Sequence, residues 1–351
     1  MHLMASELDE RKKQILKVVT DDYIASAEPV GSRTIARRYD LGLSPATIRN
    51  EMADLEEGGY LEQPHTSAGR VPSEKGYRYY VDALMSMRQL DEKEVEIIYH
   101  ELEKHHSEIE TVIHQTSKIL TQFTKYPSMA LGPQIQTAIF RHIQLVKLSQ
   151  STILVLLVTD TGYVENKIIE FENEITDLEL DRISNLLNQK LRGMNLRDIQ
   201  SNVIKELRSE MVFQDQFFSE AVKVLIKSIA EHSQERVFVD GATKILEQPE
   251  FSDILKFKPL MKALEEEDCL YKLLSNNLQK GAKVKIGREN ENYGIQDCSV
   301  VTAGYEIAGR TVGVIGVLGP TRMEYAKVLP MVEYTATILS DLLTQICKRN
   351  R

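Results

Sequence analysis

Apolar positions near the start of the chain recur at helical spacing, in segments separated by turn-forming residues. The first segment covers residues 7–26, where the apolar side chains follow a period close to 3.6 residues. The Pro-Val-Gly sequence at 29–31 ends this helix. Ser32 is a favourable N-cap for a second, short helix over 33–39. The turn at 40–43 then has about the length that a helix-turn-helix uses.

A third helix begins after Ser44, which caps it, with Pro45 at a first position where the missing N–H costs nothing. Three apolar residues at i, i+4 and i+7 form its buried stripe: Ile48, Met52 and Leu55. Four residues lie on the opposite face: Ala46, Arg49, Asn50 and Ala53. Small side chains allow close approach to DNA, an arginine pairs with guanine or phosphate, and an asparagine pairs bidentately with adenine. This face therefore has the chemistry of a recognition helix.

A strand and a basic loop follow the third helix. Gly58-Gly59 ends the helix, and residues 60–63 predict a short strand. The loop at 64–72 is rich in Pro, Gly and Ser and carries Arg70 at its tip, and a second strand or turn is expected over 77–80. The tyrosines of 77–80 are expected to pack rather than to stack on bases. This order of elements predicts a winged helix in which Arg70 reaches a minor groove or a phosphate.

The charge pattern agrees with DNA binding although the whole chain is acidic. The 351 residues carry 43 basic and 52 acidic side chains, a net charge of -9. Binding depends on where the charge lies. Residues 29–50 carry four arginines against one aspartate, residues 51–62 carry five acidic side chains, and residues 63–80 are again basic. A recognition helix enters the groove with its N-terminal residues, so the acidic half of this helix lies farther from DNA.

Residues 91–123 predict one long amphipathic helix with a heptad seam. One seam position holds Val95, Leu102, Ile109, Thr116 and Phe123, and the other holds Ile98, His105, Val112 and Ile119. Such a helix either joins the DNA reader to a sensor through a dimer or signalling contact, or packs on its own domain. The pattern leaves both possibilities open.

Apolar patterns in the next part of the chain indicate strands followed by helices. Residues 139–171 predict strands, with a hairpin turn at 160–162. Residues 178–207 predict two helices that are broken at 193–195.

A different middle region separates these strands from a second group of strands. Residues 211–275 predict helices, one of them over 217–229, and a short strand over 236–240. Further along, a hairpin over 300–318 leads into a C-terminal helix over 330–348. One sheet domain interrupted by an inserted module explains this order.

Motifs for enzymatic and metal-dependent classes are lacking. His100 and His105 are five residues apart, which places the imidazoles about 140° apart on a helix, whereas an HExxH site needs a spacing of four. Glycines recur every third residue over 313–319, but neither a GxGxxG nor a P-loop motif is present. The three cysteines lie far apart and form no CxxC pair. We therefore predict no catalytic residue, no metal and no cofactor.

The composition, 42% hydrophobic and 27% charged, is ordinary for a globular protein. The longest apolar run is Ile153–Val158, whereas a membrane-spanning helix needs about 20 apolar residues. The N-terminus has no apolar signal segment, and the cysteine usage fits a reducing compartment. We expect a cytoplasmic protein without a membrane partner, associated with the nucleoid through DNA.

Four long motifs make the chain similar to a known family. They are Glu28–Arg33, Ser44–Glu56, Gln63–Pro72 and Gly76–Val81. Together with the segment from Gly309 to Arg322, they closely resemble the bacterial heat-inducible transcription repressors that control chaperone operons.

The resemblance implies an α+β multidomain fold. It places a winged helix-turn-helix domain at 1–90, and a long linker helix with the first part of a GAF-like α/β sensor-type domain at 91–210. An inserted dimerisation module then covers 211–275, and 276–351 complete the GAF-like domain.

The resemblance also implies a sequence-specific repressor of heat-shock operons that catalyses no reaction. A homodimer would bind an inverted-repeat operator in double-stranded DNA, one protomer per half-site, and heat stress would release it. Chaperonin is the implied modulator of its activity. A regulator that senses a metabolite in the GAF-like domain, and a scaffold that uses the winged helix for protein contacts, remain alternatives.

The predicted DNA contacts fall in two sets. On the recognition helix they are Ser44, Ala46, Thr47, Arg49 and Asn50. On the second helix and the wing they are Ser32, Arg33, Thr34, His65, Thr66, Ser67 and Arg70.

Overall fold

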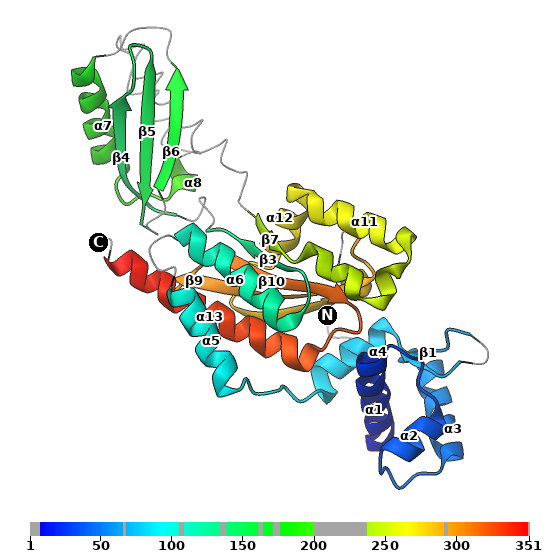
Figure 1. Cartoon of the computed structure of the whole chain (residues 1–351). Helices are drawn as coiled ribbons and strands as arrows, with labels where there is room; N and C mark the ends of the chain where they lie inside the picture. Colours follow the sequence, from blue (N-terminus) through cyan, green and yellow to red (C-terminus); the bar gives the residue numbers. More distant parts are fainter. Residues whose placement is uncertain are drawn as a thin grey trace.

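The computed structural model describes most of the chain and divides it into three parts (Figure 1). A small, mainly helical unit at the N-terminus lies at one end, a five-stranded sheet between helices lies in the centre, and a three-stranded sheet with one helix lies at the other end. The described residues are 8–65, 68–104, 109–133, 138–160, 164–170, 176–199, 237–290 and 294–349.

Three helices and a two-stranded ribbon form the N-terminal unit. They are α1 (Glu10–Ser26), α2 (Ser32–Arg38), α3 (Pro45–Glu57), β1 (Leu61–Glu62) and β2 (Val71–Pro72). The two strands are antiparallel, with Leu61 opposite Pro72. The apolar stripes of the helices meet in a core of their own that includes Ile15, Val19, Ile35 and Ile48. The three helices and the first strand thus lie where the sequence pattern predicted them.

Two local expectations for this unit were wrong. Ser32 is the first residue of α2 rather than its N-cap; Gly31 takes that position and gives no side-chain hydrogen bond. Residues 77–80 are helical rather than extended, because Ser73 caps a new helix by accepting a hydrogen bond from the Gly76 N–H at 3.1 Å. This helix, α4 (Glu74–Tyr79), runs on into the π-helical turn η1 (Tyr80–Leu84).

Five antiparallel strands form the central sheet, in the order β7-β3-β10-β9-β8. The strands are β3 (Ser128–Leu131), β7 (Val237–Asp240), β8 (Gly281–Ile286), β9 (Cys298–Ile307) and β10 (Arg310–Pro320). The predicted hairpin near the end of the chain is confirmed as β9 and β10. Its turn consists of Ala308 and Gly309, whose φ angles of 51° and 79° are both positive, as a type I′ turn requires.

Helices cover both faces of the central sheet. One face carries α6 (Ile109–Thr124) and α13 (Tyr325–Arg349), which share an apolar core with sheet residues such as Ile315. The other face is covered by η5 (Ala242–Glu247), η6 (Pro249–Ser252), α11 (Ile254–Glu265) and α12 (Glu267–Ser275). Helices α11 and α12 are therefore part of the central domain, because their leucines pack on its strands.

The three-stranded sheet interrupts the central sheet between β3 and β7. Its elements are β4 (Phe140–Lys147), β5 (Thr152–Thr159), β6 (Val164–Glu170), α7 (Asp177–Leu191) and the short α8 (Leu196–Asp198). The strands pair β4-β5-β6 with one another and with none of the described central strands. The described residues 138–199 thus lie between two strands of the central sheet, and residues 211–236 of the predicted inserted module lie outside the described residues. The predicted strands of 139–171 exist, but the pattern could not show that they form a separate sheet.

The predicted long helix over 91–123 is two helices, α5 (Glu92–Glu103) and α6, and residues 105–108 lie outside the described residues. The seam residues Ile98, Leu102, Val112 and Ile119 are buried in the core of the central domain. Of the two possibilities left open by the heptad pattern, the structure shows the packing of these helices on their own domain. The predicted helix over 217–229 lies outside the described residues.

The N-terminal unit is held against the central sheet by three side chains that we call the interdomain joint (Tyr77, Arg78 and Arg322). The ring of Tyr77 is 2% exposed and lies 6.2 Å from the ring of Tyr325 at the start of α13. Burial raises the pKa of the Tyr77 hydroxyl, which stays neutral at any physiological pH. The aromatic residues of the helical segment therefore pack, as predicted, rather than face a nucleic acid.

Two arginines complete the joint. The Arg78 guanidinium forms an ion pair with Glu289, in the short 3₁₀ helix η7 (Gly287–Glu289), and donates to the Val284 carbonyl oxygen at 2.8 Å. The Arg322 guanidinium is paired with Glu250 of η6 and donates to the Ile24 carbonyl oxygen of α1 at 3.3 Å. Arg78 belongs to the motif Gly76–Val81, and Arg322 ends the segment that starts at Gly309. Both arginines thus link the N-terminal unit to the central domain.

None of the helices in the described ranges has the length and apolar character needed to cross a membrane.

Candidate nucleic-acid interface

The predicted reading face of α3 is exposed, and its predicted core face is buried. Ile48, Met52 and Leu55 are at most 4% exposed, and they fix the helix on α1 and α2. The opposite face leaves four side chains accessible: Ala46, Arg49, Asn50 and Ala53. The face of α3 that the sequence pattern predicts for base contact is therefore not covered by other elements of the N-terminal unit.

The start of α3 is fixed by its cap. The Ser44 hydroxyl accepts a hydrogen bond from the Thr47 N–H at 3.1 Å, and the two hydroxyl oxygens lie 2.9 Å apart. Pro45 follows as the first helical residue, as predicted. This end of the helix carries no acidic side chain, so a phosphate can approach it without repulsion.

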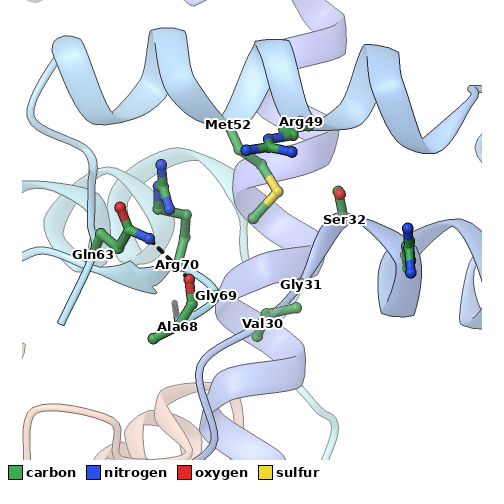
Figure 2. A pocket seen from close by; sticks show the side chains of 10 residues that line it. Val30, Gly31, Ser32, Arg49, Met52, Gln63, Ala68, Gly69 and Arg70 are labelled. Carbon is green, nitrogen blue, oxygen red and sulfur yellow. Dashed lines mark hydrogen bonds between the residues drawn. The ribbon is translucent and has the colours of Figure 1, made fainter. Parts of the chain in front are cut away.

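A cleft of about 520 Å³ lies between α2, α3 and the wing, and we call it the arginine cleft (Figure 2). Its walls hold three guanidinium groups, from Arg33 on α2, Arg49 on α3 and Arg70 on the wing. The remaining lining residues are Val30, Gly31, Ser32, Met52, Gln63, Ala68 and Gly69. Three cations on one concave surface form a site that suits the phosphates of a nucleic-acid backbone.

Two acidic residues of α3, Glu51 and Asp54, form ion pairs with cations of α1. Glu51 lies 3.4 Å from a guanidinium nitrogen of Arg11 and 3.2 Å from the Lys12 ammonium, which is also 3.2 Å from Asp54. Hydrogen bonds to Asp54 and Glu51 raise the pKa of Lys12. The sequence pattern separated the acidic segment from the reading face but could not show that α1 supplies the countercharges.

Arg70 is at the base of the wing rather than at its tip, which corrects the prediction for this residue. Its backbone pairs with Val30, with N–O distances of 2.9 and 2.8 Å. Its guanidinium turns back toward α3 and lies 2.7 Å from a carboxylate oxygen of Glu56. Figure 2 shows the side chain inside the cleft, on the side of α3, so it faces the same space as Arg49.

Gly69 makes this arrangement possible, and the sequence analysis did not single it out. A Cβ atom at this position would lie 2.4 Å from the Val30 carbonyl oxygen, which is closer than real Cβ contacts allow. Gln63 closes the wing from the other side, because its amide nitrogen donates to the Ala68 carbonyl oxygen at 3.0 Å. The only sequence feature that could have indicated this close approach was the Gly-Arg pair after a loop of small residues.

The remaining predicted residues are distributed around this site. Ser32 and Arg33 lie on the cleft wall, and Thr34 is half-buried on α2. His65 is exposed on the wing. The other two predicted wing residues, Thr66 and Ser67, lie outside the described residues. In the described part of the chain, no group of three His, Cys, Asp or Glu side chains is arranged to hold a metal ion.

The chain is similar to a family of repressors along almost its whole length. The family model described as "HrcA protein C terminal domain" matches residues 110–329. The heat-inducible transcription repressor HrcA of Pelotomaculum thermopropionicum is 45% identical over 97% of this chain and 99% of its own length. The Geobacter sulfurreducens repressor of the same name is 43% identical over 96% of this chain and 99% of its own length.

The fold is also similar to a solved structure. A crystal structure of a hypothetical protein at 2.2 Å resolution aligns with a TM-score of 0.61 and 22% identity, over 97% of this chain and 100% of the other. At this identity the likeness concerns the fold alone.

Proposed function

Because the chain belongs to the HrcA family of heat-inducible transcription repressors, we propose that it represses transcription by placing α3 in a DNA major groove. The arginine cleft then contacts the sugar-phosphate backbone beside that groove. Like its relatives, the protein is a repressor of heat-shock genes. It is not an enzyme. We propose that it acts on the chromosome, in the cytoplasm and at the nucleoid.

The observation that carries the DNA-contact proposal is the juxtaposition of a bare helix face with three arginines. Arg49 belongs to both, since it is on the exposed face of α3 and on the wall of the cleft. Neither Arg33 nor Arg49 has an acidic partner within 4.0 Å among the described residues, so both are available to a phosphate or a base edge. Phosphate contacts set the register of such a unit, and base contacts give its specificity.

We further propose that the repressor is a homodimer joined through the inserted three-stranded sheet. One face of this sheet is covered by α7. On the other face, Val146, Leu154 and Ile168 are directly opposite one another across the three strands. Ile168 is 63% exposed and Val146 is 37% exposed. An apolar sheet face of this kind is suited to burial against a second copy, and two-fold symmetry matches an inverted-repeat operator.

The layered central sheet agrees with a GAF-like effector domain. We propose that chaperonin keeps the repressor active and that heat, which occupies chaperonin with unfolded clients, lifts repression.

Fluorescence anisotropy tests the function directly. A labelled inverted-repeat duplex from upstream of the organism's chaperone operon is compared with a scrambled duplex at two salt concentrations. We expect a preference of roughly 10³-fold or more for the operator. Salt-independent or absent binding to both duplexes, with and without added chaperonin, would exclude DNA reading and favour a protein-interaction scaffold.

Arg49→Ala provides a test at the level of one residue. We expect a loss of about 1–3 kcal/mol of operator binding and relaxed base preference at one operator position, because the guanidinium is lost from the reading face. Anisotropy against a set of single-base operator variants measures both effects. Arg37→Ala, which removes an equal charge from exposed α2 outside the cleft, is the matched control. If Arg49→Ala weakens operator and scrambled DNA equally, Arg49 contacts phosphate instead of a base.

A further inference from the structure

The ion pair between Arg70 and Glu56 places an acidic side chain next to the arginine cleft. Glu56 approaches from the last turn of α3, and its carboxylate lies 2.7 Å from the Arg70 guanidinium. The ten residues that line the cleft include no acidic side chain, so Glu56 is at its margin. The nearby acidic residues Glu51 and Asp54 bind cations of α1 instead. Glu56 is thus the acidic residue of α3 that contacts the wing.

The ion pair with Glu56 leaves at least one hydrogen-bond donor of Arg70, its Nε–H group, unused. A guanidinium has five N–H donors in a planar fork. Here one terminal nitrogen contacts Glu56, while the Nε atom is buried and has no hydrogen-bond partner among the described residues. A phosphate can accept two parallel hydrogen bonds from such a fork, and an arginine-phosphate pair of this kind is stronger than a single contact.

The pair is also open to exchange. The side chain of Arg70 is 21% exposed and that of Glu56 is 34% exposed, so water and ions reach both partners. Ion pairs at such positions are weak because solvent screens them. The backbone of Arg70, by contrast, is fixed by its pairing with Val30. The guanidinium can therefore change partners while the residue stays in place at the edge of the cleft.

From this geometry we infer that Glu56 occupies Arg70 in the free repressor and competes for it with a DNA phosphate. The carboxylate stands where the anionic oxygens of the backbone bind. DNA that enters the cleft displaces Glu56 from Arg70 and takes up the donors that the carboxylate leaves unused. Glu56 thereby lowers the affinity of the reader for every DNA sequence and keeps it from being retained on random DNA. The inference rests on the proposed function, because it assumes that the cleft binds DNA.

Glu56→Gln in the full chain tests this competition by fluorescence anisotropy on the operator and scrambled duplexes. We expect affinity for both duplexes to rise about three- to tenfold, because one anion leaves the cleft margin. The salt dependence should steepen by about one unit of log affinity per log salt, since in the wild type the carboxylate freed from Arg70 takes up a cation and offsets the counterion that the phosphate releases. Glu57→Gln is the matched control, because it removes the same charge from the next residue, which is exposed and has no partner among the described residues.

The double variant Glu56→Gln, Arg70→Gln separates competition for Arg70 from general repulsion. We expect it to bind like Arg70→Gln alone, within about twofold, because Glu56 acts through Arg70. A gain of equal size in both backgrounds, or equal gains from the variants at 56 and 57, would overturn the inference. A loss of affinity in Glu56→Gln would also overturn it, since Glu56 would then position Arg70 for DNA. If the wild-type chain binds neither duplex, the proposed function itself fails.

Discussion

Gly69→Ala is expected to weaken operator binding by roughly tenfold or more, although the added group is one methyl. The new Cβ atom would lie 2.4 Å from the Val30 carbonyl oxygen and 2.8 Å from the Pro29 carbonyl carbon. Both contacts involve backbone atoms, so the wing has to move away from the segment before α2. This movement breaks the two hydrogen bonds between Val30 and Arg70, at about 0.5–1.5 kcal/mol each. It also displaces Arg70 from the cleft.

Anisotropy on the operator and thermal unfolding of the same variant measure these two effects. Gly31→Ala is the control, because Gly31 follows Val30 directly and a Cβ atom at this position would meet its nearest neighbour at 3.8 Å. We expect that variant to keep the wild-type melting temperature. If Gly69→Ala binds the operator as tightly as the wild type, the wing base does not contribute to DNA binding.

Ile168→Asp is expected to separate the proposed dimer and to reduce operator affinity by about a hundredfold or more. A carboxylate at this position would be desolvated on an apolar interface, next to Leu154 of the adjacent strand. Ile168 is 63% exposed in the single chain, so the change should leave the folding of the protomer intact. Two separate protomers bind half-sites without the gain in effective concentration that a dimer provides.

Sedimentation or light scattering gives the oligomeric state, and anisotropy gives the operator affinity. Leu178→Asp is the matched control, since Leu178 is 62% exposed on α7, which covers the other face of the same sheet. A dimer that survives Ile168→Asp but dissociates with Leu178→Asp would place the interface on the helical side. A monomeric wild type that binds the operator with full affinity would contradict the dimer proposal.

The reading helix was predictable from sequence because its signals are local. Ser44, Pro45 and the spacing of Ile48, Met52 and Leu55 lie within one helix, and they determine its start and its buried face. The same holds for the hairpin at Ala308 and Gly309, where a two-residue turn separates two apolar runs. Local periodicity and turn chemistry are sufficient for such elements.

What the sequence could not supply were contacts between distant residues. The partner of Arg70 is 14 positions earlier, and the close approach behind Gly69 involves Val30. Nothing in a linear pattern pairs these positions. The same limit applies to the inserted sheet, because alternation along Thr152–Thr159 predicts a strand but not the strands with which it pairs. For the same reason, the sequence groups α11 and α12 with the inserted module, although they pack on the central sheet.

The interdomain joint has a thermal consequence for the repressor. Tyr77 and Tyr80 belong by sequence to the DNA-binding part, yet their side chains are buried in the same apolar core as the central sheet. A fragment cut after residue 90 would expose both rings and lose the hydrogen bond from Arg322 to Ile24. Heating that loosens the sheet removes this support at the same time, so the N-terminal unit and the central domain should melt in one calorimetric transition. Release of the operator would then follow from cooperative unfolding that includes a domain outside the proposed DNA-contacting surface.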